Sequence, residues 1–487
     1  MQKPGLFLLL FLILPISLSA QSIQENTLKP GVWGGELMYQ NQSTDFFLGL
    51  TLDENGDLIA STLMPVIPFP KRSLGNVNKT VTHFTAGPIQ FTIDQTTQKI
   101  TGSFPGSSRG LHFELHPVDD FPVSGELMAG QSDASPAWSF KTGGAIWGGT
   151  AADHENVYIG STDGHLYSIS QQDGALNWKF EVDGKIYSRP LVDEGSVYIL
   201  SDGGGLYKLD SKTGTLIWAF DTGGQEWTRK LPIDENPGWD TAVSGAAVDG
   251  NTVYTGSADG HFFAIDKNTG TEKWRFKTDG PIHSIPAIAD EMVVFGSYDH
   301  HVYALNASTG NLEWKFNTGQ MIVSSPAYAD GKVIIGSRSA DLYALDATTG
   351  SEIWRYFHWG SWIESSGTIY DNHLYIGSSD DQLLKSFDPE NGTLLWTANL
   401  GGSPWSTPAI TQTTVFSGTF GNANYGIDHR GGFFAVDRIT GEVKWSYMWD
   451  KNPDTTIYGV VSSPVAVNQM VFFGGLDGVV YGFHADK

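Results

Sequence analysis

Tryptophan recurs along most of this chain at a nearly fixed interval. Trp138, Trp178 and Trp218 lie 40 residues apart, and after one gap of 56 residues Trp274, Trp314 and Trp354 are again 40 apart. A constant period of this length indicates a repeat architecture, in which each unit packs against its neighbours. The period therefore restricts the fold more than any other property of the sequence. The eight tryptophans are Trp138, Trp178, Trp218, Trp274, Trp314, Trp354, Trp396 and Trp445.

Each repeat reads as four short strands joined by tight polar turns. Residues 322–354 contain an IVSSPA strand, a KVIIGS strand, a DLYALD strand and a last strand that holds Trp354. The turn Asp330-Gly331 separates the first two strands, and Thr349-Gly350 separates the last two. Four strands per unit of 40-odd residues is the pattern of a β-propeller blade. The 58 glycines and 27 phenylalanines agree with an all-β chain.

The repeats predict eight blades over residues 136–487. Eight inner strands can be aligned, but the strand around Trp138 precedes all of them. The last unit, residues 458–487, has only three strands and no tryptophan of its own. We therefore expect the Trp138 strand to complete the last blade, which leaves no open sheet edge between the first and last blades.

Residues 25–125 lack the repeat and form a separate unit in our interpretation. Alternating segments such as Ile89–Ile93 and Leu111–Leu115 indicate half-buried strands. We expect a small β-barrel or β-sandwich here. Residues 126–135 are polar and contain Gly, Ser and Pro, and are predicted to be a linker.

Residues 1–20 have the features of a secretory signal peptide. Lys3 precedes a short apolar run, Leu6–Ile16, and small residues follow at Ser17–Ala20. The apolar run is too short for a membrane span. We expect an exported, soluble protein in the periplasm or outside the cell. The chain has no cysteine, which excludes disulfides and a lipid anchor on an N-terminal cysteine.

The charge balance excludes one class of partner. The chain carries 29 Lys and Arg against 53 Asp and Glu, a formal charge of −24. A field of that sign repels phosphate backbones, so we expect no nucleic-acid partner.

The outer half of each repeat resembles the pyrroloquinoline-quinone (PQQ) repeat, Ala-x-Asp-x-x-Thr-Gly-x-x-x-Trp. Ala344, Asp346, Thr349, Gly350 and Trp354 match it fully. The resemblance implies that the eight tryptophans dock one blade on the next, which suits a large apolar side chain with one N–H.

Two groups of proteins share this repeat. Quinoprotein alcohol dehydrogenases hold PQQ and Ca²⁺ and have an adjacent Cys-Cys disulfide, whereas propellers of the outer-membrane-assembly type have compact blades and no cofactor. The absence of cysteine and the short blades of this chain favour the second, non-catalytic group.

The candidate binding face is the one that carries the long loops. Insertions at residues 224–239, 419–430 and 448–456 all connect strands on the same face of a propeller. A variable position on the inner strands lies at the mouth of the channel on that face, and packing within the channel is an equally good explanation of it. The predicted partner-binding residues from the inner strands and the insertions are Trp147, Tyr187, Trp239, His283, Trp405, Tyr425 and Arg430.

The sequence thus predicts a binding or scaffolding protein of the cell envelope with a protein partner, no catalysis, no cofactor and no metal. The alternative is a PQQ- and calcium-dependent oxidoreductase acting on alcohols or sugars. For that alternative the residues at the channel mouth offer Arg189, one place from a proline, as a contact to a cofactor carboxylate and Glu364 as a Ca²⁺ ligand or base. A second alternative is a carbohydrate-binding propeller, so a small-molecule or glycan ligand stays open.

Overall fold

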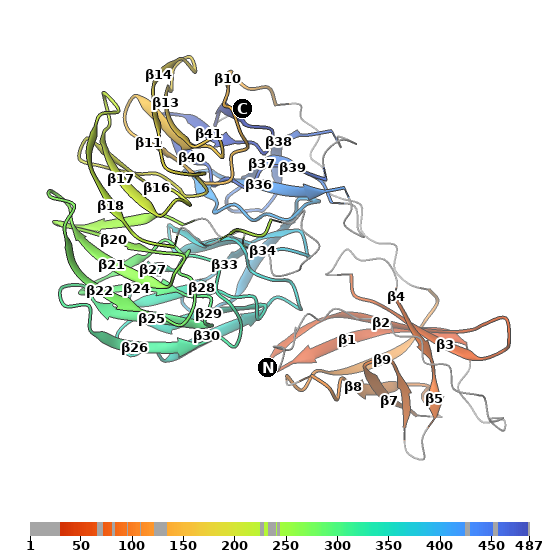
Figure 1. Cartoon of the computed structure of the whole chain (residues 1–487). Helices are drawn as coiled ribbons and strands as arrows, with labels where there is room; N and C mark the ends of the chain where they lie inside the picture. The colour runs from red at the N-terminus through yellow and green to blue at the C-terminus, as the bar shows by residue number, and fades with distance from the viewer. Residues whose placement is uncertain are drawn as a thin grey trace. The chain divides into compact units, whose positions relative to one another are not determined.

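The structure, a computed structural model, consists of two compact units, residues 1–126 and 127–487. It describes residues 30–65, 72–79, 83–94, 96–107, 109–120, 134–224, 228–231, 240, 244–423, 429–450 and 456–485. The predicted signal peptide and most of the predicted linker lie outside these residues. Every regular element within them is a β-strand (Figure 1). No helix in this described part is long and apolar enough to cross a membrane.

The first unit is one antiparallel sheet of nine strands that curls into a nearly closed barrel. Its strand order is β4-β3-β2-β1-β9-β8-β7-β6-β5. The sheet curls until β4 approaches β6, and Gly87, in the turn after β6, lies against Leu74 of β4. Of the two predicted alternatives, barrel or sandwich, the barrel is therefore correct. The strands are β1 (Gly31–Tyr39), β2 (Gln42–Leu52), β3 (Leu58–Leu63), β4 (Arg72–Asn76), β5 (Asn78–Lys79), β6 (Phe84–Ala86), β7 (Ile89–Ile93), β8 (Ile100–Ser103) and β9 (His112–Val118).

Alternation along these strands builds the barrel core. Phe46, Leu48 and Leu50 of β2 are buried, and so are Phe113 and Leu115 of β9. Because successive side chains of a strand point to opposite faces, this spacing puts the apolar residues on the inside. The alternation that predicted half-buried strands in this unit is thus confirmed.

The second unit is a propeller of eight four-stranded antiparallel sheets, one of which carries an additional short strand. Blade 1 is β11 to β14 (Thr150–Ala152, Asn156–Gly160, His165–Ser170, Leu176–Glu181), blade 2 is β15 to β18 (Leu191–Asp193, Ser196–Leu200, Gly205–Asp210, Leu216–Asp221), and blade 3 is β19 to β22 (Ala246–Asp249, Thr252–Gly256, His261–Asp266, Glu272–Lys277). Blade 4 is β23 to β26 (Ala287–Ala289, Met292–Gly296, His301–Asn306, Leu312–Asn317), and blade 5 is β27 to β30 (Ala327–Ala329, Lys332–Gly336, Asp341–Asp346, Glu352–Phe357). Blade 6 is β31 to β34 (Thr368–Tyr370, His373–Gly377, Leu383–Phe387, Leu394–Asn399), and blade 7 is β35 to β38 (Ala409–Ile410, Thr414–Asn422, Gly432–Asp437, Val443–Met448) with the added strand β39 (Ile457–Gly459).

Blade 8 combines both ends of the propeller sequence. Strands β40 to β42 (Val465–Val467, Met470–Gly474, Val479–His484) pair with β10 (Trp138–Lys141) in the order β10-β42-β41-β40 (Figure 1). Trp138 lies opposite Gly482, and Lys141 lies opposite Val479. The predicted eight blades and their closure by the Trp138 strand are confirmed.

The repeated motif explains how neighbouring blades dock. The Asp346 carboxylate accepts hydrogen bonds from the backbone N–H groups of Thr348 and Thr349 and so fixes the turn after β29. Gly350, at a φ of 71°, then lies on the indole ring of Trp314 from the preceding blade. The Trp314 Nε1–H donates to the Ala347 carbonyl at 2.7 Å. Seven of the eight tryptophans donate to a carbonyl of the next blade in this way.

Trp445 is the exception. Its indole is 2% exposed, and its N–H has no hydrogen-bond partner in the part of the chain that the structure describes. It packs against Phe483 of blade 8 and belongs to the same apolar cluster as Ala134. The Ala134 N–H donates to the Ser446 carbonyl at 3.4 Å. Ala134, near the end of the predicted linker, thus packs against the propeller.

Gly350→Ala should destabilise the propeller by about 2–4 kcal/mol, because it adds backbone strain and overpacking. A Cβ at position 350 would lie 2.6 Å from ring atoms of Trp314. Gly331 is a matched control, since its φ is 72° but a Cβ there would meet nothing within 4 Å. Gly331→Ala should cost only about 1 kcal/mol of strain. Urea unfolding of both variants measures the difference, and equal losses would contradict the docking role of Gly350.

Candidate functional site

Apolar side chains fill one half of the channel mouth on the insertion face. Trp147, Tyr187, Trp405 and Val461, from the inner strands of blades 1, 2, 7 and 8, form one cluster with Phe420. Each of them is between 1% and 8% exposed. The rings of Trp405 and Phe420 stack at 4.3 Å, with 10° between their planes. We call these five residues the aromatic plug, and their packing closes this half of the mouth.

One of the predicted insertions supplies part of the plug. Strand β36 continues to Asn422, beyond its pairing with β37, and its end pairs with β39, so that Phe420 lies opposite Gly459. The Tyr458 hydroxyl donates to the His429 carbonyl at 2.8 Å, which joins the two sides of the insertion. The described part of this loop therefore folds back over the channel.

The other half of the mouth is charged and hydrogen-bonded. Arg229 lies between two carboxylates, with Nε 2.8 Å from Asp202 Oδ2 and Nη1 3.1 Å from Asp240 Oδ1. Asp240 also lies 3.0 Å from Nδ1 of His283 and accepts a hydrogen bond of 2.5 Å from the Tyr298 hydroxyl. The Arg229 guanidinium stands 4.8 Å from the ring of Tyr187, which connects this network to the aromatic plug.

The charges of this network hold Asp240 ionised. Burial alone would raise the pKa of Asp240, but the neighbouring His283 and Arg229 outweigh it and keep the pKa well below its ordinary value. Burial, reinforced by the Asp240 charge, raises the pKa of the Tyr298 hydroxyl far above its usual range. The hydroxyl therefore remains a donor to Asp240 at every physiological pH.

Acid should weaken this network in a predictable direction. A carboxyl whose folded pKa is depressed stabilises the fold above its unfolded pKa of about 3.9, and this contribution is lost as pH falls through the folded value. We expect the urea concentration at the unfolding midpoint to decrease when the pH is lowered below about 4. In Asp240→Asn this decrease with falling pH should be smaller. The measurement is a set of urea curves between pH 7 and 2.5. If the urea midpoint depended on pH in the same way in the variant, Asp240 would not contribute to acid unfolding.

A second ion pair lies further round the mouth. Arg338 donates from Nε to Glu364 Oε1 at 2.7 Å and from Nη2 to Glu364 Oε2 at 3.1 Å. The two side chains are 6% and 3% exposed, and the guanidinium lies 4.8 Å from the ring of Trp362. Burial lowers the pKa of Arg338, but the Glu364 charge raises it by more, so the guanidinium keeps its charge. Both oxygens of Glu364 are thus bound to a cation of the chain itself.

The structure brings most of the predicted site residues together, but in a packed interior. Trp147, Tyr187 and Trp405 were expected at an open mouth, and instead they are buried in the aromatic plug. His283 is 4% exposed and faces Asp240. This burial agrees with the alternative explanation, packing within the channel, and the partner-binding role of these residues stays a prediction.

The predicted insertion residues have different outcomes. Arg430 is exposed, and its backbone anchors the loop through a hydrogen bond from its N–H to the Gly401 carbonyl. Trp239 and Tyr425 lie outside the described residues, so their roles stay predictions. No feature of the sequence marked Phe420 as a core residue. Arg338 had a weak signal, because it stands in a turn that reads Ser-x-Asp-Gly at residues 161–164 and 257–260, where its position is taken by Thr162 and Ala258.

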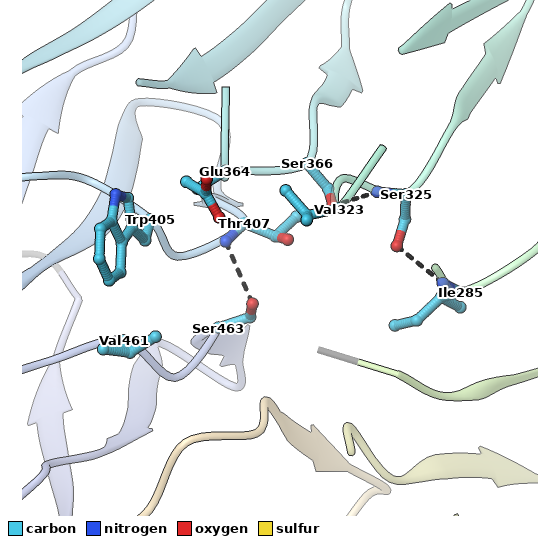
Figure 2. Close-up of a pocket in the computed structure, with 9 residues that line it drawn as sticks. All are labelled: Ile285, Val323, Ser325, Glu364, Ser366, Trp405, Thr407, Val461 and Ser463. Carbon is cyan, nitrogen blue, oxygen red and sulfur yellow. Dashed lines mark hydrogen bonds between the residues drawn. The ribbon is translucent and has the colours of Figure 1, made fainter. Parts of the chain in front are cut away.

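The residues present do not fit PQQ with Ca²⁺. Glu364, the proposed ligand, is bound through both oxygens to Arg338, and the Nε–H of Arg189 donates to the Thr150 carbonyl at 3.2 Å. The cavity beside Glu364 has a volume of about 20 Å³ and takes little more than one water molecule (Figure 2). No group of three or more His, Cys, Asp or Glu side chains suited to a metal ion occurs among the residues described.

Comparison with known proteins identifies the propeller. The sequence profile of the family described as outer membrane protein assembly factor BamB matches residues 129–228, 219–356 and 319–486. The chain belongs to this family. The predicted resemblance to PQQ-like propellers of the outer-membrane-assembly type is thereby confirmed for the propeller unit. No curated protein sequence matches the chain.

Solved structures share the fold of this BamB-family propeller at low identity. BamB from Moraxella catarrhalis is 20% identical, with a TM-score of 0.53 over 72% of this chain and 98% of its own. A europium-containing methanol dehydrogenase is 14% identical, with a TM-score of 0.55 over 70% of this chain and 85% of its own. The Saccharomyces cerevisiae protein Sqt1 is 14% identical, with a TM-score of 0.57 over 72% and 99%. At these identities the likeness concerns the fold alone.

Proposed function

We propose that this chain is an exported binding or scaffolding protein of the cell envelope, without catalysis or a cofactor of its own. The observation that carries the proposal is the filled channel. The aromatic plug occupies one half of the mouth. Arg338 binds the Glu364 carboxylate, which a quinone site would need for its metal ion. A catalytic site requires a concave pocket with polar groups that converge on a substrate.

Family membership supports the partner class and the location. The family description refers to outer-membrane protein assembly, which takes place in the envelope through contacts between proteins. The predicted signal peptide agrees with export. We propose a protein partner, bound on the insertion face around Arg430, and a periplasmic or secreted location without a lipid anchor.

Binding to a partner purified from envelope extract tests this proposal. Arg430→Ala should weaken binding about 5- to 150-fold, which corresponds to roughly 1–3 kcal/mol, because arginine side chains often dominate contact energies. Lys212→Ala is the matched control, since Lys212 is exposed in a short turn on the opposite face of the propeller. If Lys212→Ala weakened binding and Arg430→Ala did not, the contact face would be the opposite one.

A titration with PQQ and Ca²⁺ separates this proposal from the quinoprotein alternative. We expect no saturable quinone absorbance and no dye reduction with alcohols or sugars. Dye reduction that is lost in Glu364→Gln would overturn the proposal. Retention on immobilised glycans, with no protein partner, would instead favour the carbohydrate-binding alternative.

A further inference from the structure

A second ring of side chains lies in the channel below the mouth. It is formed by the residue two positions after the variable one on each inner strand, which follows a serine in seven blades and Gly148 in the first. Four members carry hydroxyl groups, and all four line the cavity of about 20 Å³ (Figure 2). The eight members are Gly149, Arg189, Gly245, Ile285, Ser325, Ser366, Thr407 and Ser463.

The serine hydroxyls of this ring accept hydrogen bonds from the backbone, and their own hydrogens are available to donate. Ser325 Oγ accepts the Ile285 N–H at 2.8 Å, Ser366 Oγ accepts the Ser325 N–H at 2.8 Å, and Ser463 Oγ accepts the Thr407 N–H at 3.1 Å (Figure 2). In the described structure none of these oxygens donates its own hydrogen to a protein acceptor. A serine hydroxyl has one donor and two acceptor sites, so each keeps its O–H for a group in the cavity.

Arg189 brings a positive charge to the same ring. Glycines stand on either side of it, and its Cγ and Cδ occupy the space that a side chain at Gly149 would need. Its Nε–H donates to the Thr150 carbonyl, and the Thr150 N–H donates to the carbonyl of Ser463, which lines the cavity. Arg189 does not itself line the cavity, and these two hydrogen bonds connect its guanidinium to the backbone of Ser463 in the cavity wall.

No carboxylate of the described residues pairs with Arg189. Arg229 and Arg338, the other two arginines of the channel, each bind a carboxylate. Burial lowers the pKa of Arg189, with no opposing charge to offset it. A guanidinium presents five N–H donors, of which only the Nε–H has a protein acceptor here.

We propose that the channel binds one small monovalent anion of about the size of chloride, held by Arg189 and the hydroxyls of the second ring. Four hydroxyl groups line the cavity beside the side chains of Ile285, Val323, Trp405 and Val461, and its single carboxylate, Glu364, is paired with Arg338. The small volume excludes phosphate and organic carboxylates. The bound ion links blade 2 to the blades across the axis and braces the propeller from inside. This inference does not depend on the proposed function.

Chloride binding to the full-length protein is measured by the line width of the ³⁵Cl NMR signal and by thermal unfolding. The protein is prepared in gluconate, and chloride is added at constant ionic strength. We expect a saturable line broadening that nitrate or bromide displaces, and a saturable rise in melting temperature. Gluconate, which is too large for the cavity, should have neither effect.

Arg189→Met should weaken chloride binding at least tenfold, and Arg189→Lys should retain part of it. Thr407→Val keeps the side-chain shape and removes one hydroxyl, so it tests the site even if Arg189→Met fails to fold. Lys212→Met removes a positive charge from the surface, away from the channel, and should leave chloride binding unchanged. If the broadening survives in both Arg189→Met and Thr407→Val, or if the melting temperature follows ionic strength alone, the cavity holds only water and the proposal is wrong.

Discussion

A chain that lacks residues 138–141 should aggregate under conditions in which the intact protein stays monomeric. Removing β10 uncovers the edge of β42 in blade 8 and breaks the ring of sheets. Exposed strand edges pair with other chains. Size-exclusion chromatography coupled to light scattering measures the expected shift to large species.

A single substitution tests the closure of blade 8 by β10 without removing the strand. Trp138 is 9% exposed, stacks on Phe472 at 5.4 Å and donates its N–H to the Gln171 carbonyl at 2.8 Å. Trp138→Ala should cost roughly 3–5 kcal/mol of unfolding free energy, as for other buried large aromatics. Ser139→Ala, at an exposed position of the same strand, is the control. A Trp138→Ala variant as stable as this control would show that closure contributes nothing to stability.

Arg338→Met should lower the unfolding free energy by about 3–5 kcal/mol, because it removes the buried cation that pairs with the Glu364 carboxylate. The double variant Arg338→Met/Glu364→Gln removes both charges and should recover much of that loss. Urea unfolding at pH 7 measures the four states of the cycle. A double variant that is less stable than Arg338→Met would contradict the assignment.

The exposed pair Arg355–Glu352 provides the control for this cycle. Its side chains are 31% and 28% exposed, so Arg355→Met should cost less than about 1 kcal/mol. Equal losses for Arg355→Met and Arg338→Met would mean that burial of the Arg338 pair has no energetic consequence.

The sequence predicted the propeller correctly because its repeat encodes contacts between neighbours. The spacing from Asp346 to Gly350 fixes a turn, and the turn places Gly350 on Trp314. These interactions recur in blade after blade, so they are visible as a periodic pattern. The position of the Trp138 strand followed from counting strands. The last blade had only three strands of its own, and the Trp138 strand belonged to no other blade.

The site was predicted less well because it depends on features that occur once. Alignment of the inner strands identified Trp405 as a mouth residue, but Phe420, which stacks on it, comes from an insertion with no counterpart in the other blades. Arg229 also comes from an insertion, and its pairing with Asp240 joins two distant parts of one loop. Sequence periodicity carries no information about such pairs.

The pairing of β10 with β42 also constrains the order in which the propeller forms. Trp138 and Gly482 are about 340 residues apart in the chain, and synthesis at roughly 5–20 residues per second separates them by about 20–70 s. During that interval β10 has no partner, while blades 1 to 7 assemble from neighbouring strands. Ring closure therefore cannot precede the synthesis of blade 8, and it brings together the most distant contact of the sheet network. A waiting strand can also complete blade 8 of another copy, so strand exchange is the misassembly that this topology favours at high concentration.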